Sequence, residues 1–274
     1  MSYENFYGLK EQAFSNAPDS RFYFESRQHS EALVRMLHTV DTMKGLTVVL
    51  GDIGTGKTML ARKALEMMEQ DPQYEPSLLV IIHGDITAEW LLKKIAHHLG
   101  VENPADSKDQ IVNQLTERIL RIKEEGRKAV VVIDEANMIQ KKEIFEEFRG
   151  LLNLEIPGRK LISFVFLGLP ELEKNLALDP PLLQRVAMKI VLQSLPRETT
   201  EQYIRHRLAV AGRTKDIFTE NAFRKIFGYS KGIPRLINTL CDNAMLEGYL
   251  LKRNWIDADI IEQVVIDLGL NKNY

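Results

Sequence analysis

The sequence has a single cysteine, Cys241, so an internal disulfide is excluded. Cys241 falls in the helical pattern of residues 236–251, which predicts a buried core residue and fits a reducing compartment. The longest apolar run, residues 161–169, is too short to span a bilayer. Residues 1–6 lack the basic and apolar regions of a secretory signal. We therefore expect a soluble, cytoplasmic chain without a transmembrane segment.

The sequence also lacks a charge excess. Its 36 basic and 38 acidic side chains give a formal charge of −2, so composition gives no global signal for nucleic acid or for an anionic membrane. Internal repeats and low-complexity linkers are absent from the sequence as well. With 274 residues, the chain can bury a large core and form two domains, or one domain with a helical appendage.

A glycine-rich motif, Gly51-Asp-Ile-Gly-Thr-Gly-Lys57-Thr58, follows the apolar run 46–50 and precedes a helical pattern over residues 59–70. Glycines allow the backbone to turn tightly around an anion, so that N–H groups point at a phosphate and the helix N-terminus adds positive potential. The motif therefore predicts a P-loop that binds a nucleotide. The expected binding residues are Asp52, Ile53, Gly54, Thr55, Gly56, Lys57, Thr58 and Met59.

Two carboxylates follow a second apolar run, residues 129–133, and complete the predicted chemistry. Lys57 is expected to reach the β- and γ-phosphates, while Thr58 faces the position of a bridging Mg²⁺. Asp134 would hold this Mg²⁺ through water, so Thr58 and Asp134 are the predicted metal residues. Glu135 would act as the general base that polarises the attacking water.

Apolar runs and helical patterns alternate along the first two thirds of the chain, which predicts an α/β fold with a parallel sheet. The five expected strands cover residues 46–50, 78–82, 129–134, 161–167 and 188–192. After residue 196 only helical patterns occur, over 198–211, 219–227, 234–251 and 257–268. We therefore expect a nucleotide-binding αβα domain over residues 1–195 and an all-helical lid over 196–274.

Residues 1–30 form an irregular segment that is rich in aromatic side chains and must pack against a core. One interpretation is that the rings cover the edge of the nucleotide-binding domain, and the other is that they line a pocket for the nucleotide base. The aromatic residues concerned are Phe6, Tyr7, Phe14, Phe22, Tyr23 and Phe24.

Further short motifs extend over nearly the whole chain. They are Phe6-Tyr7-Gly8-Leu9 with Phe14, Pro18-Asp19-Ser20-Arg21-Phe22, His29-Ser-Glu31-Ala32-Leu33, Ile133-Asp-Glu-Ala136, Asn153-Leu-Glu155, Gly168 with Pro170-Glu-Leu172, Gln184-Arg185, and Gly232-Ile-Pro-Arg-Leu-Ile-Asn238 continuing to Leu240-Cys-Asp242. Together with the P-loop, this set resembles the AAA+ ATPases, and within them the bacterial general secretion pathway protein A (ExeA-type) group.

This resemblance implies a three-layer AAA+ domain that binds ATP with Mg²⁺ and hydrolyses it. It assigns Arg185 as an arginine finger that reaches a neighbouring subunit's nucleotide, and Arg235 as the sensor 2 arginine that contacts the γ-phosphate within its own subunit. A positioned guanidinium stabilises charge on the transferring phosphoryl oxygens. A finger acting between subunits implies a ring or helical homo-oligomer, hexameric with ATP.

The sequence departs from the family pattern at two positions. Ala136-Asn137 stands where Ala-Gln is usual, and Gly168-Leu169-Pro170 stands where Gly-Gln-Pro is usual. A polar side chain at the second position can orient the attacking water, which Leu169 cannot do. We therefore expect either slow hydrolysis or a substitute group such as Asn137.

Three functions remain open from the sequence. The first is an ATPase that drives assembly of a secretion or pilus apparatus, associated with the inner membrane through its partners. The second is a DNA-binding ATPase that regulates transposition, and the third is an ATP-binding switch with slow turnover. The chain ends at Tyr274 without the transmembrane and peptidoglycan-binding regions of longer secretion members, so it is either their ATPase part or a stand-alone relative.

Overall fold

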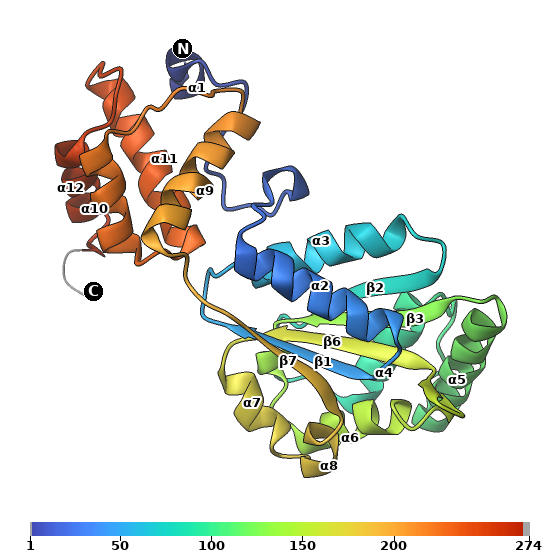
Figure 1. The fold of residues 1–274 in the computed structure, drawn as a ribbon. Coiled ribbons are helices and arrows are strands. Elements are labelled where there is room, and N and C mark those ends of the chain that lie inside the picture. Colours follow the sequence, from blue (N-terminus) through green and yellow to red (C-terminus); the bar gives the residue numbers. More distant parts are fainter. Residues whose placement is uncertain (1, 271–274) are drawn as a thin grey trace. The chain divides into compact units, whose positions relative to one another are not determined.

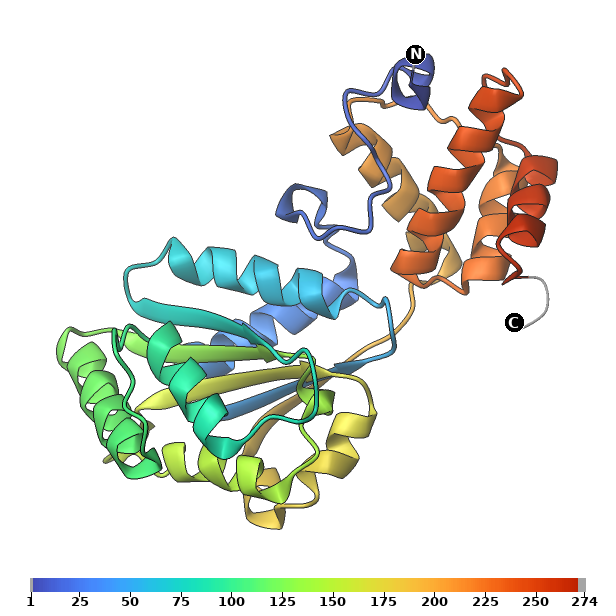
Figure 2. The same cartoon turned by 180° about the vertical axis from the view of Figure 1, so that it is seen from behind.

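The computed structural model describes residues 2–270, and these residues form two compact units (Figures 1 and 2). Residues 27–53 and 57–192 form the first, which we call the sheet unit. Of the described residues, 2–26, 54–56 and 193–270 are grouped in the second, which we call the helical unit. The change of unit at residue 193 lies three residues before the expected start of the lid, residue 196, and both the N-terminal segment and residues 54–56 are grouped with the helices.

The sheet unit is built on a parallel sheet, which in the described residues has five strands in the order β2-β3-β6-β1-β7 (Figure 1). The three inner strands are almost wholly buried, as expected for apolar runs that are covered on both faces. This confirms the predicted α/β class and the five-stranded parallel sheet. The strands are β1 (Leu46–Gly51), β2 (Tyr74–Val80), β3 (Lys128–Asp134), β6 (Ile162–Gly168) and β7 (Val186–Leu192).

Helices cover both faces of this sheet and produce three layers (Figures 1 and 2). One face carries α2 (Arg27–Asp41) and α3 (Lys57–Glu69). The other face carries α4 (Ala88–His98), α5 (Lys108–Glu124) and α6 (Lys142–Leu151). Two short helices that the sequence did not predict, α7 (Glu171–Leu176) and α8 (Pro180–Leu183), lie between β6 and β7. Helix α8 packs against α6, and α7 packs against α8 and the 3-10 helix η2 (Ala136–Met138).

Strand β2 differs from the predicted strand because it begins at Tyr74, four residues earlier than expected. Pro76 lies within this strand, which in the described residues is at an edge of the sheet and pairs only with β3. An edge strand tolerates proline, because one side of the strand needs no N–H donor. The edge position also explains why Val80 is 43% exposed rather than buried.

The helical unit contains four long helices that correspond to the four predicted after residue 196. They bury one another's apolar faces, and Cys241 lies in their core with no exposed surface, as predicted. Gly232 has φ of +76°, and a Cβ at this position would lie 1.9 Å from the carbonyl oxygen of Leu195. The helices are α9 (Arg197–Val210), α10 (Glu220–Ser230), α11 (Pro234–Leu250) and α12 (Ala258–Asp267).

The N-terminal segment packs into the core of this helical unit. Tyr7, Phe14 and Phe22 are almost fully buried there, against residues of α9 to α12. Our expectation that residues 1–30 would belong to the nucleotide-binding domain is therefore corrected for residues 2–26, whereas residues 27–30 lie in the sheet unit. The rings do cover a core, but it is that of the helices. The segment includes helix α1 (Tyr3–Tyr7) and the 3-10 helix η1 (Ser20–Phe22).

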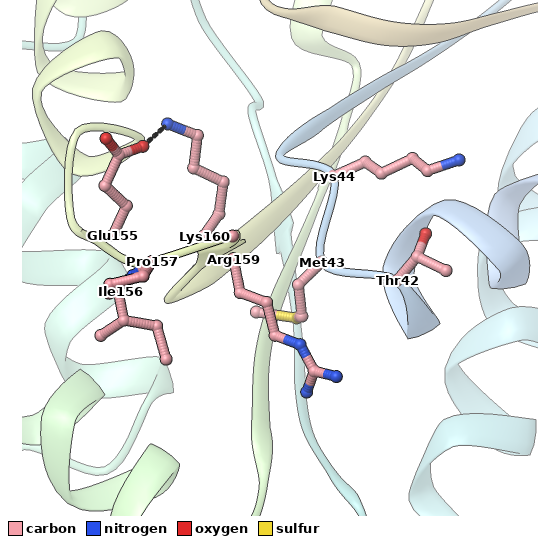
Figure 3. A pocket seen from close by; sticks show the side chains of 9 residues that line it. Thr42, Met43, Lys44, Glu155, Ile156, Pro157, Arg159 and Lys160 are labelled. Carbon is pink, nitrogen blue, oxygen red and sulfur yellow. Dashed lines mark hydrogen bonds and ion pairs between the residues drawn. The ribbon is translucent and has the colours of Figure 1, made fainter.

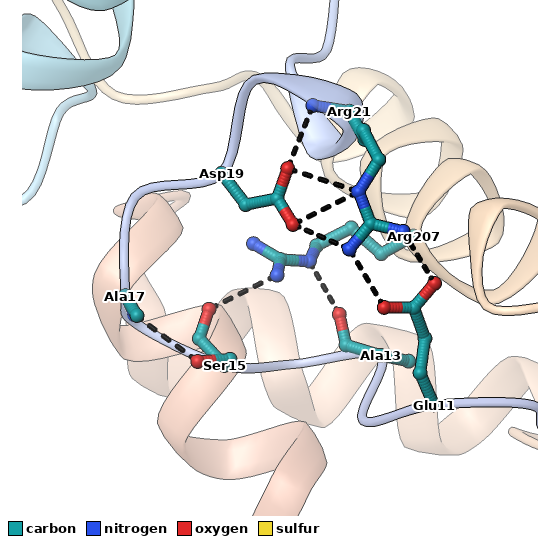
Figure 4. Close-up of polar contacts among 7 residues, drawn as sticks. All are labelled: Glu11, Ala13, Ser15, Ala17, Asp19, Arg21 and Arg207. Carbon is teal, nitrogen blue, oxygen red and sulfur yellow. Dashed lines mark hydrogen bonds and ion pairs between the residues drawn. The ribbon is translucent and has the colours of Figure 1, made fainter.

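A buried arginine of α9, Arg207, binds the backbone of this segment and holds it against the helix (Figure 4). Its Nε and one terminal nitrogen donate hydrogen bonds to the backbone carbonyls of Ala13 and Ser15, at 2.6 and 3.0 Å. The other terminal nitrogen donates to the hydroxyl of Tyr203 at 3.0 Å, and the guanidinium lies 4.7 Å from the ring centre of Phe22. One side chain thus supplies donors to two backbone carbonyls of the N-terminal segment.

We expect Arg207→Met to lower the free energy of unfolding of the helical unit by about 2–5 kcal/mol, because the buried carbonyl of Ala13 and the partly buried carbonyl of Ser15 lose their donor. Urea unfolding measures the loss, and limited proteolysis should cut the variant within residues 1–26 first. The matched control is Arg205→Met on the same helix, since Arg205 is 44% exposed and pairs with Asp216 on the surface. Its removal should cost less than about 1 kcal/mol. Equal losses in both variants would contradict the anchoring role of Arg207.

Candidate active site

The glycine-rich motif forms the turn between β1 and α3, as the sequence predicted. Gly54 and Gly56 have φ of +80° and +103°, values that glycine adopts without strain. Helix α3 begins at Lys57, so the turn and the positive end of the helix lie together. The ammonium of Lys57 is buried and donates hydrogen bonds to the carbonyls of Gly51 and Asp52, at 2.7 and 3.0 Å. The lysine is therefore held against the loop that would receive the phosphates.

The predicted metal residues lie next to each other. The hydroxyl of Thr58 donates a hydrogen bond to Oδ2 of Asp134 at 2.8 Å, which links the first turn of α3 to the end of β3. The backbone N–H of Glu135 donates to Oδ1 of the same carboxylate at 2.9 Å. Asp134 is only 2% exposed, so both of its oxygens are fixed by protein donors at the carboxyl edge of the sheet.

These oxygen ligands fit Mg²⁺, which prefers hydroxyl and carboxylate oxygens and is usually bound through one or two protein groups together with phosphates and water. Among residues 2–270, no group of three histidine, cysteine or acidic side chains could hold a metal ion by itself. A Mg²⁺ at Thr58 and Asp134 would therefore depend on a bound phosphate for further ligands.

Glu135 stands at a sharp turn directly after β3. Its φ and ψ are 55° and 35°, the left-handed region that non-glycine residues seldom adopt. Such a conformation costs about 1–3 kcal/mol and is frequent at functional sites. The turn ends the strand, leads into η2 (Ala136–Met138) and leaves the glutamate partly exposed beside Asp134. The sequence could place this residue at a strand end, but it could not predict the backbone conformation.

Asn137, the expected substitute for a water-orienting residue, is hydrogen-bonded to other parts of the protein through its side chain and its backbone. Its side-chain oxygen accepts a hydrogen bond from the backbone N–H of Leu169 at 3.0 Å. Its backbone carbonyl accepts one from the amide of Asn175 at 2.9 Å. A Cβ on Gly168 would lie 2.8 Å from the same side-chain oxygen, so the close approach requires glycine. Asn137 thus holds the residue after β6 and the last turn of α7 against the segment that follows Glu135.

Arg185 lies at the opposite edge of the sheet from the glycine-rich loop. It immediately precedes β7, whose first residue Val186 pairs with Leu46, whereas its last residue Leu192 pairs with Gly51. Five residues of extended strand separate the two ends, a distance of about 17 Å. The guanidinium donates a hydrogen bond to the backbone carbonyl of Arg149 at 2.9 Å. From this edge Arg185 does not reach the loop of its own chain.

Arg235 lies on the first turn of α11, directly after Pro234, and its residue is exposed. Its backbone N–H donates to the carbonyl of Gly54 at 3.3 Å, and both residues belong to the helical unit. A Cβ on Gly54 would lie 2.7 Å from that of Arg235. The close packing gives a second reason, besides φ, for glycine at position 54.

A cavity of about 670 Å³ lies at the amino-terminal edge of the sheet (Figure 3). Lys44 and Met43 line one side, just before β1, and a small hairpin lines the other. The hairpin consists of β4 (Glu155–Ile156) and β5 (Arg159–Lys160), with an ion pair between Lys160 and Glu155. Strands of two residues leave no periodic signal, so the sequence did not predict this feature. The cavity does not include the residues predicted to bind the nucleotide.

Comparison with known proteins supports the predicted family. A family model described as an AAA domain matches residues 40–176. General secretion pathway protein A of Aeromonas hydrophila is 32% identical over 252 residues, which cover 90% of this chain and 45% of that protein. The chain therefore spans less than half the length of this curated relative.

In the described residues, no helix is both long and apolar enough to cross a membrane.

Two solved structures share the fold at low sequence identity. The ORC2 protein of Aeropyrum pernix, in ADPNP and ADP complexes, has a TM-score of 0.68 and is 15% identical; the match covers 94% of this chain and 72% of that chain. Cdc6p of Pyrobaculum aerophilum has a TM-score of 0.71 and is 18% identical, with 93% and 70% covered. At these identities the likeness supports the fold alone.

Proposed function

This chain belongs to the AAA+ ATPase family, and on that basis we propose that it binds ATP with Mg²⁺ and hydrolyses it within a homo-oligomer. The observation that carries the proposal is the hydrogen bond of 2.8 Å between Thr58 and Asp134, beside the strained turn at Glu135. It joins the first turn of α3, directly after the glycine-rich loop, to Asp134, the residue before the proposed general base Glu135. An ordinary glycine-rich turn has no need of such a partner.

Each residue then has a defined task. The N–H groups of residues 52–58 and the ammonium of Lys57 would bind the phosphates, while Thr58 and Asp134 would hold Mg²⁺. When bound, Mg²⁺ neutralises charge on the phosphate oxygens. Glu135 would accept the proton of the attacking water. Arg185 of a neighbouring subunit and Arg235 of the same chain would stabilise charge on the γ-phosphate as it is transferred.

Similarity to general secretion pathway protein A favours assembly of a secretion or pilus apparatus as the use of this ATPase. Leu169 favours the slow-turnover switch as the second candidate, because a leucine cannot orient water and Asn137 already holds the backbone of Leu169. For the first candidate we expect the protein to release phosphate steadily from Mg·ATP, with a rate per subunit that rises with protein concentration as subunits assemble.

Phosphate release over a range of protein concentrations tests this proposal, with EDTA as the metal-free control. Tight ATP binding with less than one turnover per hour would instead support the switch. Retardation of duplex DNA of unrelated sequence in the presence of ATP, at moderate salt, would support the DNA-binding ATPase. Absence of ATP binding would contradict all three functions.

A further inference from the structure

An ion pair between a buried aspartate, Asp179, and a partly exposed arginine, Arg149, lies beside Arg185 in the sheet unit. The carboxylate of Asp179 is almost fully buried at the start of α8, with 1% of the residue exposed. One of its oxygens, Oδ2, accepts a hydrogen bond from Nε of Arg149 at 2.9 Å. The other, Oδ1, caps α8 by accepting from the backbone N–H of Leu182 at 3.1 Å. The carboxylate therefore joins α6, which carries Arg149, to α8.

Arg185 is hydrogen-bonded to one partner of this ion pair, Arg149, and to the helix that the other partner, Asp179, caps. Its guanidinium donates to the backbone carbonyl of Arg149 at 2.9 Å, so the same residue that binds Asp179 through its side chain binds Arg185 through its backbone. The backbone N–H of Arg185 donates to the carbonyl of Leu182 at 2.9 Å, in the helix that Asp179 caps. Two short chains of hydrogen bonds thus lead from Asp179 to Arg185.

Stability alone does not require a charge at position 179. Burying a carboxylate is costly, and an apolar pair of similar volume often serves as well or better. Leu182 already anchors α8 in the apolar core of the sheet unit. The ion pair instead fixes the relative orientation of α6 and α8, because a guanidinium and a carboxylate bind each other in a defined geometry. A directional contact is useful where a neighbouring group must be held at a defined place.

We propose that Asp179 and Arg149 are positioning residues for Arg185, which hold its guanidinium in place for the nucleotide of the neighbouring subunit. This inference rests on the proposed function. A misplacement of about 1 Å in a charged group can lower a rate about 100-fold, so loss of the ion pair should reduce hydrolysis without reducing nucleotide binding.

The test is Asp179→Asn, which keeps a side chain that can cap α8 but removes the charge that pairs with Arg149. We expect ATP affinity within twofold of the parent and phosphate release lowered about 100-fold. Mixed with Lys57→Ala protein, the variant should recover hydrolysis, because it supplies an intact loop and receives an intact arginine. Mixed with Arg185→Ala protein it should not recover, because both lack a positioned arginine.

The matched control is Asp257→Asn, which changes the aspartate that caps α12 by accepting from the N–H of Ile260 at 3.2 Å. Its hydrolysis should equal that of the parent. A second variant, Arg149→Lys, keeps the charge and the backbone carbonyl but loses the planar set of guanidinium N–H donors. Its phosphate release should fall by less than that of Asp179→Asn, again with unchanged ATP affinity. If Asp179→Asn does not fold, Arg149→Lys tests the positioning role on its own.

Two results would overturn the inference. Parent-like hydrolysis by folded Asp179→Asn or by Arg149→Lys would remove the positioning role, and so would recovery when Asp179→Asn is mixed with Arg185→Ala. Failure of the proposed function looks different. If Arg185→Ala itself hydrolyses ATP at the parent rate, Arg185 has no role between subunits and the inference is refuted with it.

Discussion

Glu135→Gln protein is expected to bind ATP as tightly as the parent and to hydrolyse it about 10²- to 10⁴-fold more slowly. Glutamine has nearly the same shape as glutamate, but it cannot take the proton of the attacking water. The glutamate would act only when water attacks, so its loss should lower kcat and leave ground-state binding unchanged. Equilibrium binding of ATP and single-turnover phosphate release measure the two quantities separately.

Lys57→Ala should give the opposite result, because the ammonium would act on the phosphates of the bound ground state. Loss of a charged hydrogen-bond donor of this kind weakens binding by about 1.5–3 kcal/mol, and we expect the variant to lose tight ATP binding. Matched controls come from neighbouring surface positions, namely Lys63→Ala on α3 and Glu143→Gln on α6. Lys63 pairs with Glu66 at 3.2 Å and Glu143 is exposed, so both should behave as the parent.

A parent rate of hydrolysis in Glu135→Gln would show that Glu135 is not the base. The strained backbone at this residue would then need another explanation, because φ of 55° in a non-glycine residue is retained only where the surroundings enforce it. A loss of ATP binding in both Glu135→Gln and Lys57→Ala would indicate that the turn after β3 holds the loop together rather than performing chemistry.

The elements that sequence predicts well are those whose signal is local. The inner strands of the sheet are short continuous apolar runs, and the long helices repeat apolar residues at helical spacing, so both follow from periodicity. The phosphate loop and the acidic pair after β3 are also local patterns, and the structure brings Thr58 and Asp134 together as the motifs require. The predicted roles of these residues in binding and hydrolysis remain predictions.

The features that could not be predicted from the sequence depend on contacts between residues that are far apart in the chain. Aromatic side chains in residues 1–30 indicate that the segment packs against a core, but nothing local indicates which core, and it is that of the helices. In the sequence, Arg207 looks like an ordinary surface arginine of a helix, and only the fold brings the carbonyls of Ala13 and Ser15 to it. Helices of four to six residues, such as α7 and α8, are too short for a periodic pattern. Asp179 before Pro180-Pro181 was an available signal of a helix start.

The arginine before β7 gives the second large prediction: Arg185→Ala should lower hydrolysis by about 10³-fold in the assembled protein. The reason is its place at the edge of the sheet opposite the phosphate loop of its own chain. If Arg185 acts on a nucleotide at all, that nucleotide belongs to another subunit. Such a contact is heterologous, so subunits would assemble as a ring or helix, and ATP should favour assembly by the same factor as assembly favours ATP.

Mixing two inactive variants tests this directly. Arg185→Ala subunits keep an intact phosphate loop and Lys57→Ala subunits keep an intact arginine, so a mixed interface can combine both. In a random one-to-one mixture about a quarter of heterologous interfaces join an intact loop to an intact arginine. Hydrolysis should therefore return to about that fraction of the parent rate, measured by phosphate release at a constant total protein concentration.

The control mixture combines Glu135→Gln with Lys57→Ala. Both of these changes affect the loop side of the interface, so no combination of the two restores a complete site, and hydrolysis should stay at the level of the separate proteins. Recovery in this control would mean that mixing itself raises activity. If the Arg185→Ala mixture shows no recovery and sedimentation gives a single monomer mass with ATP, Arg185 does not act between subunits. Its hydrogen bond to the carbonyl of Arg149 would then be its whole function, as a contact that joins the start of β7 to α6.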